Sequence, residues 1–396
     1  MFYIAIKMLI GARTKYIGLL LGIAFTAFLI TFALSYFSGF LTRGFALISE
    51  NPTADIWVMN RAVNSTEMTI NIPNSSLEIV RGVEGVEYAV PLSISDVTAI
   101  FANGRFQTFH IIGVDDVTLA GASQPKDNIP IEILHTPQSI IVDSGGTIDK
   151  LLTPVNSEDQ WAFDGVHLNV PMRNLRVSDE LLINGKRVIV KGISSSNPRF
   201  PPKPLIYTTI SNVKRINPLG NRIITFILVR AQKDISLKAL SKRIERQTGL
   251  RARTQDEFKK DTVMWFLLNS EDVGDMFSMV ALAMLVGFGV TGIMLYMLTY
   301  ENLKHYAVLK AIGASNNMII KMVFTQAGVS ALIGYGLGIG LCTIINEIVI
   351  TTGYPFRMMY FALILSFLGV FLISVIVSLI SIRPILKLDP AVVFSS

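Results

Sequence analysis

Few side chains in this sequence are of the kind that performs catalysis or binds a metal. The histidines lack the spacings that zinc sites use; they are His110, His135, His167 and His305. The single cysteine, Cys342, falls within a long apolar stretch, and no G-x-S-x-G pattern marks a nucleophilic serine. We therefore expect neither a catalytic residue nor a metal ion in this chain.

Nucleotide binding by this chain is not expected either. The sequence contains no G-x-x-x-x-G-K-[ST] loop; Gly185 and Lys186 are followed by Arg187 and lie between two β-rich runs, as in a hairpin turn. The long apolar stretches lack the acids and bases of a proton relay, except for Glu347 near the end of one of them. We expect no cofactor in the chain itself.

The most informative motif is the short polar segment 301–315, which reads ENLKHYAVLKAIGAS. Its apolar side chains recur at helical spacing, and a glycine follows where a helix would end. A short helix held between two apolar stretches is suited to carry force from a partner protein; the alternative is a connector that is merely solvated. We expect apolar contacts to this partner from Leu303, Tyr306 and Leu309, charged contacts from Glu301, Lys304 and Lys310, and a turn at Gly313.

Composition predicts the elements around this motif. Hydrophobic residues make up 51% of the 396 residues, charged residues only 16%, and the mean hydropathy is +0.50. Soluble domains carry roughly 25% charged residues, so a purely soluble protein is not expected. Uncharged stretches of 24 to 27 residues are long enough to cross a bilayer; they are 16–42, 276–300, 323–346 and 358–382.

The positions of the charges predict the orientation in the membrane. The central region, 43–275, has 26 basic and 26 acidic residues, and the net charge of +6 lies in the segments outside it. Because basic segments stay in the cytoplasm, both termini are expected inside and the central region outside. The basic character of the chain therefore needs no nucleic acid partner, and none is expected.

The expected organisation is an α-helical membrane protein with four transmembrane helices and a large α/β extracytoplasmic domain inserted between the first two. The N-terminal segment 1–15 is expected to be cytoplasmic or interfacial, either as a helix at the interface or as a disordered basic flank. The remaining segments are the spans 16–42, 276–300, 323–350 and 358–382, the external domain with stalk ends 43–275, a cytoplasmic coupling loop 301–322, an external turn 351–357 and a cytoplasmic tail 383–396.

Glycines in the spans predict close helix packing. Gly18 and Gly22 share a G-x-x-x-G spacing in the first span, and Gly334, Gly336, Gly338 and Gly340 give two more in the third. This spacing lets helix backbones approach closely. The sequence leaves open whether the contacts lie within one chain or between two copies.

The external domain shows both strand and helix signals. Asn-Gly pairs at 103–104 and 184–185 separate β-rich runs, which favours two hairpins with type I′ turns. Residues 223–229 are expected to form a strand, 236–248 a helix, and 121–137 and 197–204 loops. No internal repeat is evident, so the sequence does not divide this domain further.

Segment 301–315 resembles the "E…ALLKAIGA" loop of MacB/FtsX-type ABC transporter permeases, which share the order of one span, a large domain and three spans. The ending 388–394, LDPAVVF, resembles the "DPA..F" ending of the DevC-like branch. Residues 140–143 and 183–193 resemble elements of the external domain of that branch.

The resemblance implies a homodimeric permease of the bacterial inner membrane, driven by a separate ABC ATPase that binds ATP and Mg²⁺ and docks on 301–315. Stalks over 35–50 and 255–275 would move the periplasmic domain and drive export of a lipid, glycolipid, drug or peptide. A periplasmic adaptor (a membrane fusion protein) and an outer-membrane duct are further expected partners. An FtsX-like regulator of a cell-wall hydrolase and a lipoprotein-release permease remain as alternatives.

Overall fold

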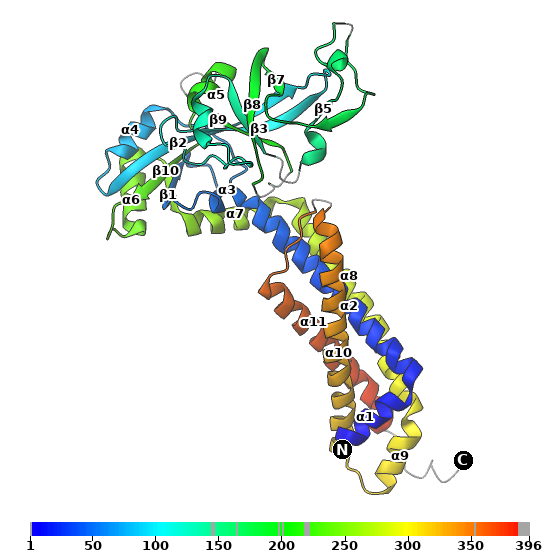
Figure 1. Cartoon of the computed structure of the whole chain (residues 1–396). Helices are drawn as coiled ribbons and strands as arrows, with labels where there is room; N and C mark the ends of the chain where they lie inside the picture. Colours follow the sequence, from blue (N-terminus) through cyan, green and yellow to red (C-terminus); the bar gives the residue numbers. More distant parts are fainter. Residues whose placement is uncertain are drawn as a thin grey trace. The chain divides into compact units, whose positions relative to one another are not determined.

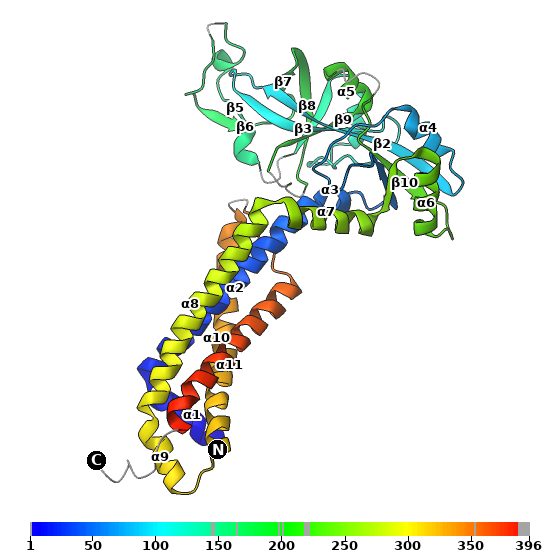
Figure 2. The same ribbon diagram turned by 180° about the vertical axis from the view of Figure 1, so that it is seen from behind.

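The computed structural model describes residues 2–143, 147–163, 165–196, 199, 202–217, 222–351 and 354–386. The chain forms two compact units, and each is described by itself. A helical unit comprises Met1–Phe40 with Ser270–Ser396, and a mixed α/β unit comprises Leu41–Asn269. Both units are visible in the ribbon views of Figures 1 and 2.

The helical unit is built from long helices that run side by side (Figures 1 and 2). Four helices among the described residues are long and apolar enough to cross a membrane. The helices are α1 (Phe2–Gly11), α2 (Arg13–Gly44), α8 (Glu271–Glu301), α9 (Leu303–Ala311), α10 (Asn316–Thr351) and α11 (Tyr360–Leu386). The four apolar helices are α2, α8, α10 and α11. This agrees with the prediction of four apolar spans.

Two apolar clusters hold the helical unit together. One joins the middles of the long helices, with Ile23 and Ile30 of α2 packed against Leu295 of α8 and Val370 of α11. The other joins α1 and α9 to the ends of α10 and α11. The residues between α10 and α11 include Pro355, whose backbone lies where a Cβ of Gly39 would be, so α2 carries a glycine at that contact.

One half of the α/β unit is a βαββαβ arrangement. Its four strands lie in the order β11-β1-β10-β2, each antiparallel to its neighbour. This is the strand order 4-1-3-2 of ferredoxin-like folds. The elements are β1 (Ile56–Met59), α4 (Ser75–Arg81), β2 (Val86–Ile100), β10 (Phe226–Ala231), α6 (Leu237–Thr248) and β11 (Arg251–Thr254).

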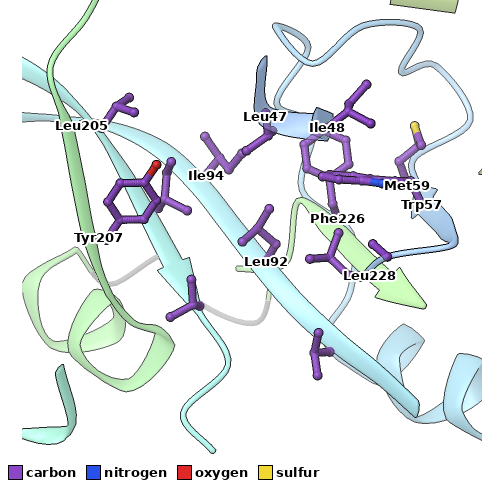
Figure 3. Packing of buried hydrophobic residues seen from close by; sticks show 14 of the residues in the cluster. Leu47, Ile48, Trp57, Met59, Leu92, Ile94, Leu205, Tyr207, Phe226 and Leu228 are labelled. Atoms are coloured by element: carbon purple, nitrogen blue, oxygen red, sulfur yellow. The ribbon is translucent and has the colours of Figure 1, made fainter. Parts of the chain in front are cut away.

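Each face of this four-stranded sheet has its own apolar core. On one face, Val80 of α4 and Ile244 of α6 pack with Ile56 and Val58. On the other face, Trp57 lies beside Phe226, as Figure 3 shows, with ring centroids 5.5 Å apart in an edge-on arrangement. Helices α3 (Ala46–Ser49) and α7 (Gln255–Asn269) contribute to this second core, to which Phe258 adds a third ring.

The other half of the unit is a closed ring of six strands that shares β2 with the first half. From β2 the pairing runs through β3, β9, β4, β8 and β7 and returns to β2, where Ala99 pairs with Ile183. Closure leaves no free edge within the ring, and its interior is filled by buried aliphatic and aromatic side chains. The added strands are β3 (Phe106–Val114), β4 (Ser139–Asp143), β7 (Glu180–Ile183), β8 (Lys186–Ser194) and β9 (Leu205–Thr209).

Short elements decorate this ring. They are the strand pair β5 (Leu152–Pro154) and β6 (Met172–Asn174), the helix α5 (Ile210–Ile216), and the 3-10 turns Ile131–His135, Ile148–Lys150 and Ser157–Asp159. The first of these turns lies within 121–137, which the sequence predicts only as a loop.

Both predicted hairpins are present, but only one has the predicted turn. At the second, Ile183 pairs with Lys186, and Asn184 and Gly185 both have positive φ, as a type I′ turn requires. At the first, the last pair is Ile100 with Phe106, so the turn is longer than two residues. Asn103 is buried there and donates to the carbonyl of His167, which explains why the tight turn does not form.

The remaining predicted elements differ from the structure mainly at their ends. The predicted helix 236–248 is α6, whereas the predicted strand 223–229 is β10, which begins three residues later, at Phe226. The stalk predicted over 255–275 is not one continuous helix, since α7 ends at Asn269 and α8 begins at Glu271. Part of the predicted loop 197–204 lies outside the described residues. The whole of the motif 388–394 lies outside them as well.

Candidate functional site

The predicted motif 301–315 forms a short helix, α9, between two long ones. Gly313 follows it with φ +101°, a conformation that favours glycine. The amide of Ala314 donates to the carbonyl of Leu309 at 2.9 Å, and the amide of Gly313 donates to that of Lys310 at 3.0 Å. This is a Schellman motif, so the predicted stop at Gly313 is confirmed.

The inner face of α9 is fixed by a chain of hydrogen bonds. Tyr306 is completely buried, and its hydroxyl donates to Oε1 of Gln326 in α10 at 2.9 Å. Nε2 of Gln326 in turn donates to the carbonyl of Ala5 in α1 at 3.0 Å. Burial raises the pKa of Tyr306 to about 12, so the phenol keeps its proton and remains a donor at physiological pH.

Lys310 ties α9 to a third helix. Its ammonium donates to the carbonyls of Ile385 at 2.9 Å and Leu386 at 3.2 Å, at the C-terminal end of α11. A cation there satisfies terminal carbonyls and the negative end of the helix dipole. The helix α9 is thus bonded to α10 and α11 and linked through Gln326 to α1.

The structure shows how the predicted contact residues of α9 pack against the bundle. Leu303 and Leu309 pack against the buried cluster around Tyr306, and Lys310 is bound to α11. These four side chains were expected to contact a partner; in the structure Tyr306 is buried in the helical unit and the other three are half-buried against it, and their contact with a partner stays a prediction. The physical reason is that the nearest apolar surface for a helix held at both ends is the bundle that holds it.

A different set of α9 side chains is exposed. Lys304, His305 and Val308 are exposed, and Ile312, just after the helix, has 79% of its surface exposed. Glu301, at the end of α8, forms an ion pair with Lys15 of α2. Of the predicted contact residues in this segment, Lys304 lies on the exposed face of α9.

The glycines singled out in the spans make contacts within this chain. A Cβ at Gly22 would lie 2.7 Å from Val290 of α8, and one at Gly18 3.4 Å from Met294. A Cβ at Gly334 would lie 2.6 Å from Ile23, and one at Gly338 2.5 Å from the carbonyl oxygen of Ala24. These glycines therefore let α2 pack closely on α8 and α10, whereas Gly336 and Gly340 have open space around them.

Sequence reasoning missed two buried features of this unit. Gln326 links three helices, and its only sequence signal is a large amide side chain within an uncharged stretch. Gly287 of α8 is the other, since a Cβ there would clash with the side chain of Thr26.

The α/β unit contains a partly buried group of charged residues beside a small cavity. The cavity is lined by Glu67, His110 and Arg199, among others. Nδ1 of His110 faces a carboxylate oxygen of Asp96, and Nζ of Lys203 lies 3.0 Å from the other oxygen of Asp96. Among the described residues no group of three or more metal-ligating side chains is brought together.

Comparison with known proteins shows similarity to a family of permeases. Residues 277–390 match the model of the "FtsX-like permease C-terminal" family. The chain is 29% identical over 191 residues to "Macrolide export ATP-binding/permease protein MacB" of Vibrio parahaemolyticus, and 28% identical to the protein of that name in Shewanella sp. (strain ANA-3). Residues 277–390 therefore form an FtsX-like permease domain, and the chain is similar to MacB proteins.

The match to these MacB proteins is partial. Each alignment spans 46% of this chain but only 28% of the relative. The periplasmic region of MacB from Actinobacillus actinomycetemcomitans is similar to 54% of this chain and 94% of its own, with 14% identity and a TM-score of 0.36. The extracellular domain of the transporter YknZ from Gram-positive bacteria matches with a TM-score of 0.32. Scores at this level are too low to support a conclusion about this chain.

Proposed function

We propose that this chain is the permease subunit of an ABC transporter in the bacterial inner membrane, driven by an ATPase on a separate chain. The observation that carries the proposal is α9, a short helix bonded rigidly into the bundle with one face left exposed. ATP hydrolysis in the partner would push on this face and move the helices attached to it. The ATP and Mg²⁺ would be bound by the partner.

Rigidity on the inner face is what such a coupling element needs. A push on a loosely attached loop would be absorbed by the loop, whereas a push on α9 reaches α10 through Tyr306 and α11 through Lys310. The exposed residues Lys304, Val308 and Ile312 would form the contact with the ATPase. Val308 and Ile312 offer apolar surface, and apolar side chains at the centre of a contact contribute most to binding.

The large α/β unit would lie outside the membrane and act on the exported substrate. Export is favoured over regulation of a cell-wall hydrolase or lipoprotein release because the relatives are named as macrolide exporters. A lipid, glycolipid, drug or peptide would be the substrate. A second copy of the chain, a periplasmic adaptor and an outer-membrane duct would complete the system, and the DevC-like branch remains a prediction from the sequence.

The test is the effect of a charge on the exposed face of α9. We expect Val308→Glu to reduce co-purification with the ATPase and permease-stimulated hydrolysis by tenfold or more, because a carboxylate would replace apolar surface at the centre of the contact and lose its water there. Val117→Glu places the same change on an exposed valine of the α/β unit and serves as the control. Normal complex formation and hydrolysis in Val308→Glu would show that α9 is not the docking element.

A further inference from the structure

A groove of about 590 Å³ opens in the helical unit between α1 and the junction of α8 with α9. It is distinct from the proposed ATPase contact of Lys304, Val308 and Ile312, since none of these three residues lines it. Side chains of both polar and apolar type line the groove, among them Tyr3, Ile4, Lys7, Met8, Asn302 and His305.

The groove lies at the level where the apolar helices meet the polar boundary of a bilayer. Lys15 is the last charged residue before the uncharged stretch 16–42, and Glu301 is the first after 276–300. These two residues form an ion pair with each other. Because charged side chains stay out of the hydrocarbon core, the pair marks the depth of the lipid headgroups, and Glu301 lines the groove.

The chemistry of the lining matches a phospholipid. The ammonium of Lys7 lies 4.9 Å from the ring centroid of Tyr3, and among the described residues no carboxylate lies within ion-pair distance of it. His305 contributes an exposed imidazole, and the single acid of the lining, Glu301, is already neutralised by Lys15. Ile4 and Met8 supply apolar surface beside these polar groups.

We propose that this groove binds an anionic phospholipid, with the headgroup phosphate at Lys7 and His305 and the start of an acyl chain against Ile4 and Met8. The assignment to the cytoplasmic leaflet rests on the orientation in the proposed function. An anionic lipid is favoured over a zwitterionic one because residues 1–15 carry three basic residues and no acid. A lipid is favoured over a protein partner because the groove lies at headgroup depth.

The bound lipid would stabilise the contact between α1 and the junction of α8 with α9. It contacts α1 on one side and Asn302 and His305 on the other, so its presence would hold α1 against the start of α9. The charge at Lys7 provides selectivity, since attraction between one basic residue and an anionic bilayer lipid corresponds to about a fivefold preference.

The test uses the full-length protein in detergent, stripped of lipid and without the ATPase. Phosphatidylglycerol and phosphatidylcholine with identical acyl chains are titrated, and native mass spectrometry counts the bound lipids. We expect the preference for phosphatidylglycerol to fall about fivefold in Lys7→Gln and to be retained in Lys7→Arg. Lys304→Gln removes an exposed cation that does not line the groove and should leave the preference unchanged.

Two outcomes would overturn the proposal. In one, Lys7→Gln keeps the full preference; in the other, Lys304→Gln loses as much as Lys7→Gln, which would indicate diffuse attraction rather than a site. In the first case, loss of the ATPase by Lys7→Gln in a separate co-purification would identify the groove as a protein contact. Since the titration contains no ATPase, a failure of Val308→Glu to affect hydrolysis would leave the lipid result intact.

Discussion

Glu67 is a carboxyl group whose ionisation the fold of the α/β unit opposes. Burial raises its pKa to about 7, although the cations of Lys203 and Arg199 lower it and Asp96 adds a smaller increase. Desolvation therefore outweighs the attraction of two basic neighbours. His110, on the same cavity, has its pKa lowered, chiefly by burial and against the effect of Asp96.

The pKa of Glu67 predicts a dependence of stability on pH. Because the folded pKa exceeds the ordinary value of 4.5, Glu67 favours folding most below that pH, and this contribution is lost as the pH rises to about 7. Glu67→Gln stays neutral, so its stability relative to the wild type should rise between pH 5 and 7 and then level off. We expect a change on the order of 1–2 kcal/mol, allowing for partial exposure.

Tryptophan fluorescence is a suitable measurement for this prediction, since Trp57, Trp161 and Trp265 all lie in the α/β unit. Thermal unfolding of the full-length protein would be followed at several pH values. Glu87→Gln, at an exposed position of β2, is the control and should show no such trend. A constant difference between Glu67→Gln and wild type across this range would contradict the prediction.

At the residue scale, the sequence predicted which side chains share a helix face better than it predicted what that face contacts. Helical spacing correctly placed Leu303, Tyr306 and Leu309 together, but spacing alone does not indicate whether a face turns toward the bundle or toward a partner. Tyr306 faces inward because Gln326 provides a hydrogen-bond acceptor there, and that pairing joins residues 20 positions apart. Consequently Leu309→Asp would damage the bundle itself and cannot test docking.

At the scale of elements, the glycines of α10 offer a matched pair. A Cβ at Gly338 would lie 2.5 Å from the carbonyl oxygen of Ala24 and 2.6 Å from the Cβ of Ala27, so α2 and α10 would have to separate. Gly340 lies on the same helix with nothing within 4 Å of a Cβ. The two positions therefore differ in contact while sharing helix and residue type.

We expect Gly338→Ala to destabilise the helical unit by about 1–3 kcal/mol, as overpacking does. Gly340→Ala should be neutral or stabilising, since alanine favours a helix by about 1 kcal/mol over glycine. Thermal unfolding monitored by circular dichroism at the helical band would compare the two variants. Equal melting temperatures would mean that the close contact between α2 and α10 does not contribute to stability.

Local elements could be predicted from the sequence, but their assembly could not. The hairpin of β7 and β8 was predicted because Asn184 and Gly185 are a turn signal adjacent in the chain. The edge pairing of β1 with β11, where Ile56 faces Thr254, joins residues nearly 200 positions apart and leaves no local signal. Strand β1 is moreover buried at every position, so it shows no alternation that would mark a strand.

At the scale of the whole molecule, the four apolar helices and the α/β unit agree with the sequence prediction. These features follow from composition, since long uncharged stretches and a charge-balanced central region are visible without any knowledge of contacts. The ferredoxin-like half and the closed ring were not separable in advance because they share β2, whose first half pairs with β10 and whose second half pairs with β3.

The orientation in the membrane is the remaining expectation from the charge pattern, and two exposed positions can test it. Cys342 is buried, and in a Cys342→Ala background a single new cysteine is the only thiol. We expect a membrane-impermeant maleimide to label Gln124→Cys of the α/β unit in intact spheroplasts. Lys304→Cys of α9 should react only after the membrane is opened, because basic segments remain in the cytoplasm. Since both side chains are exposed, burial cannot explain a difference between them. The reverse labelling pattern would place α9 outside and remove it from any cytoplasmic ATPase.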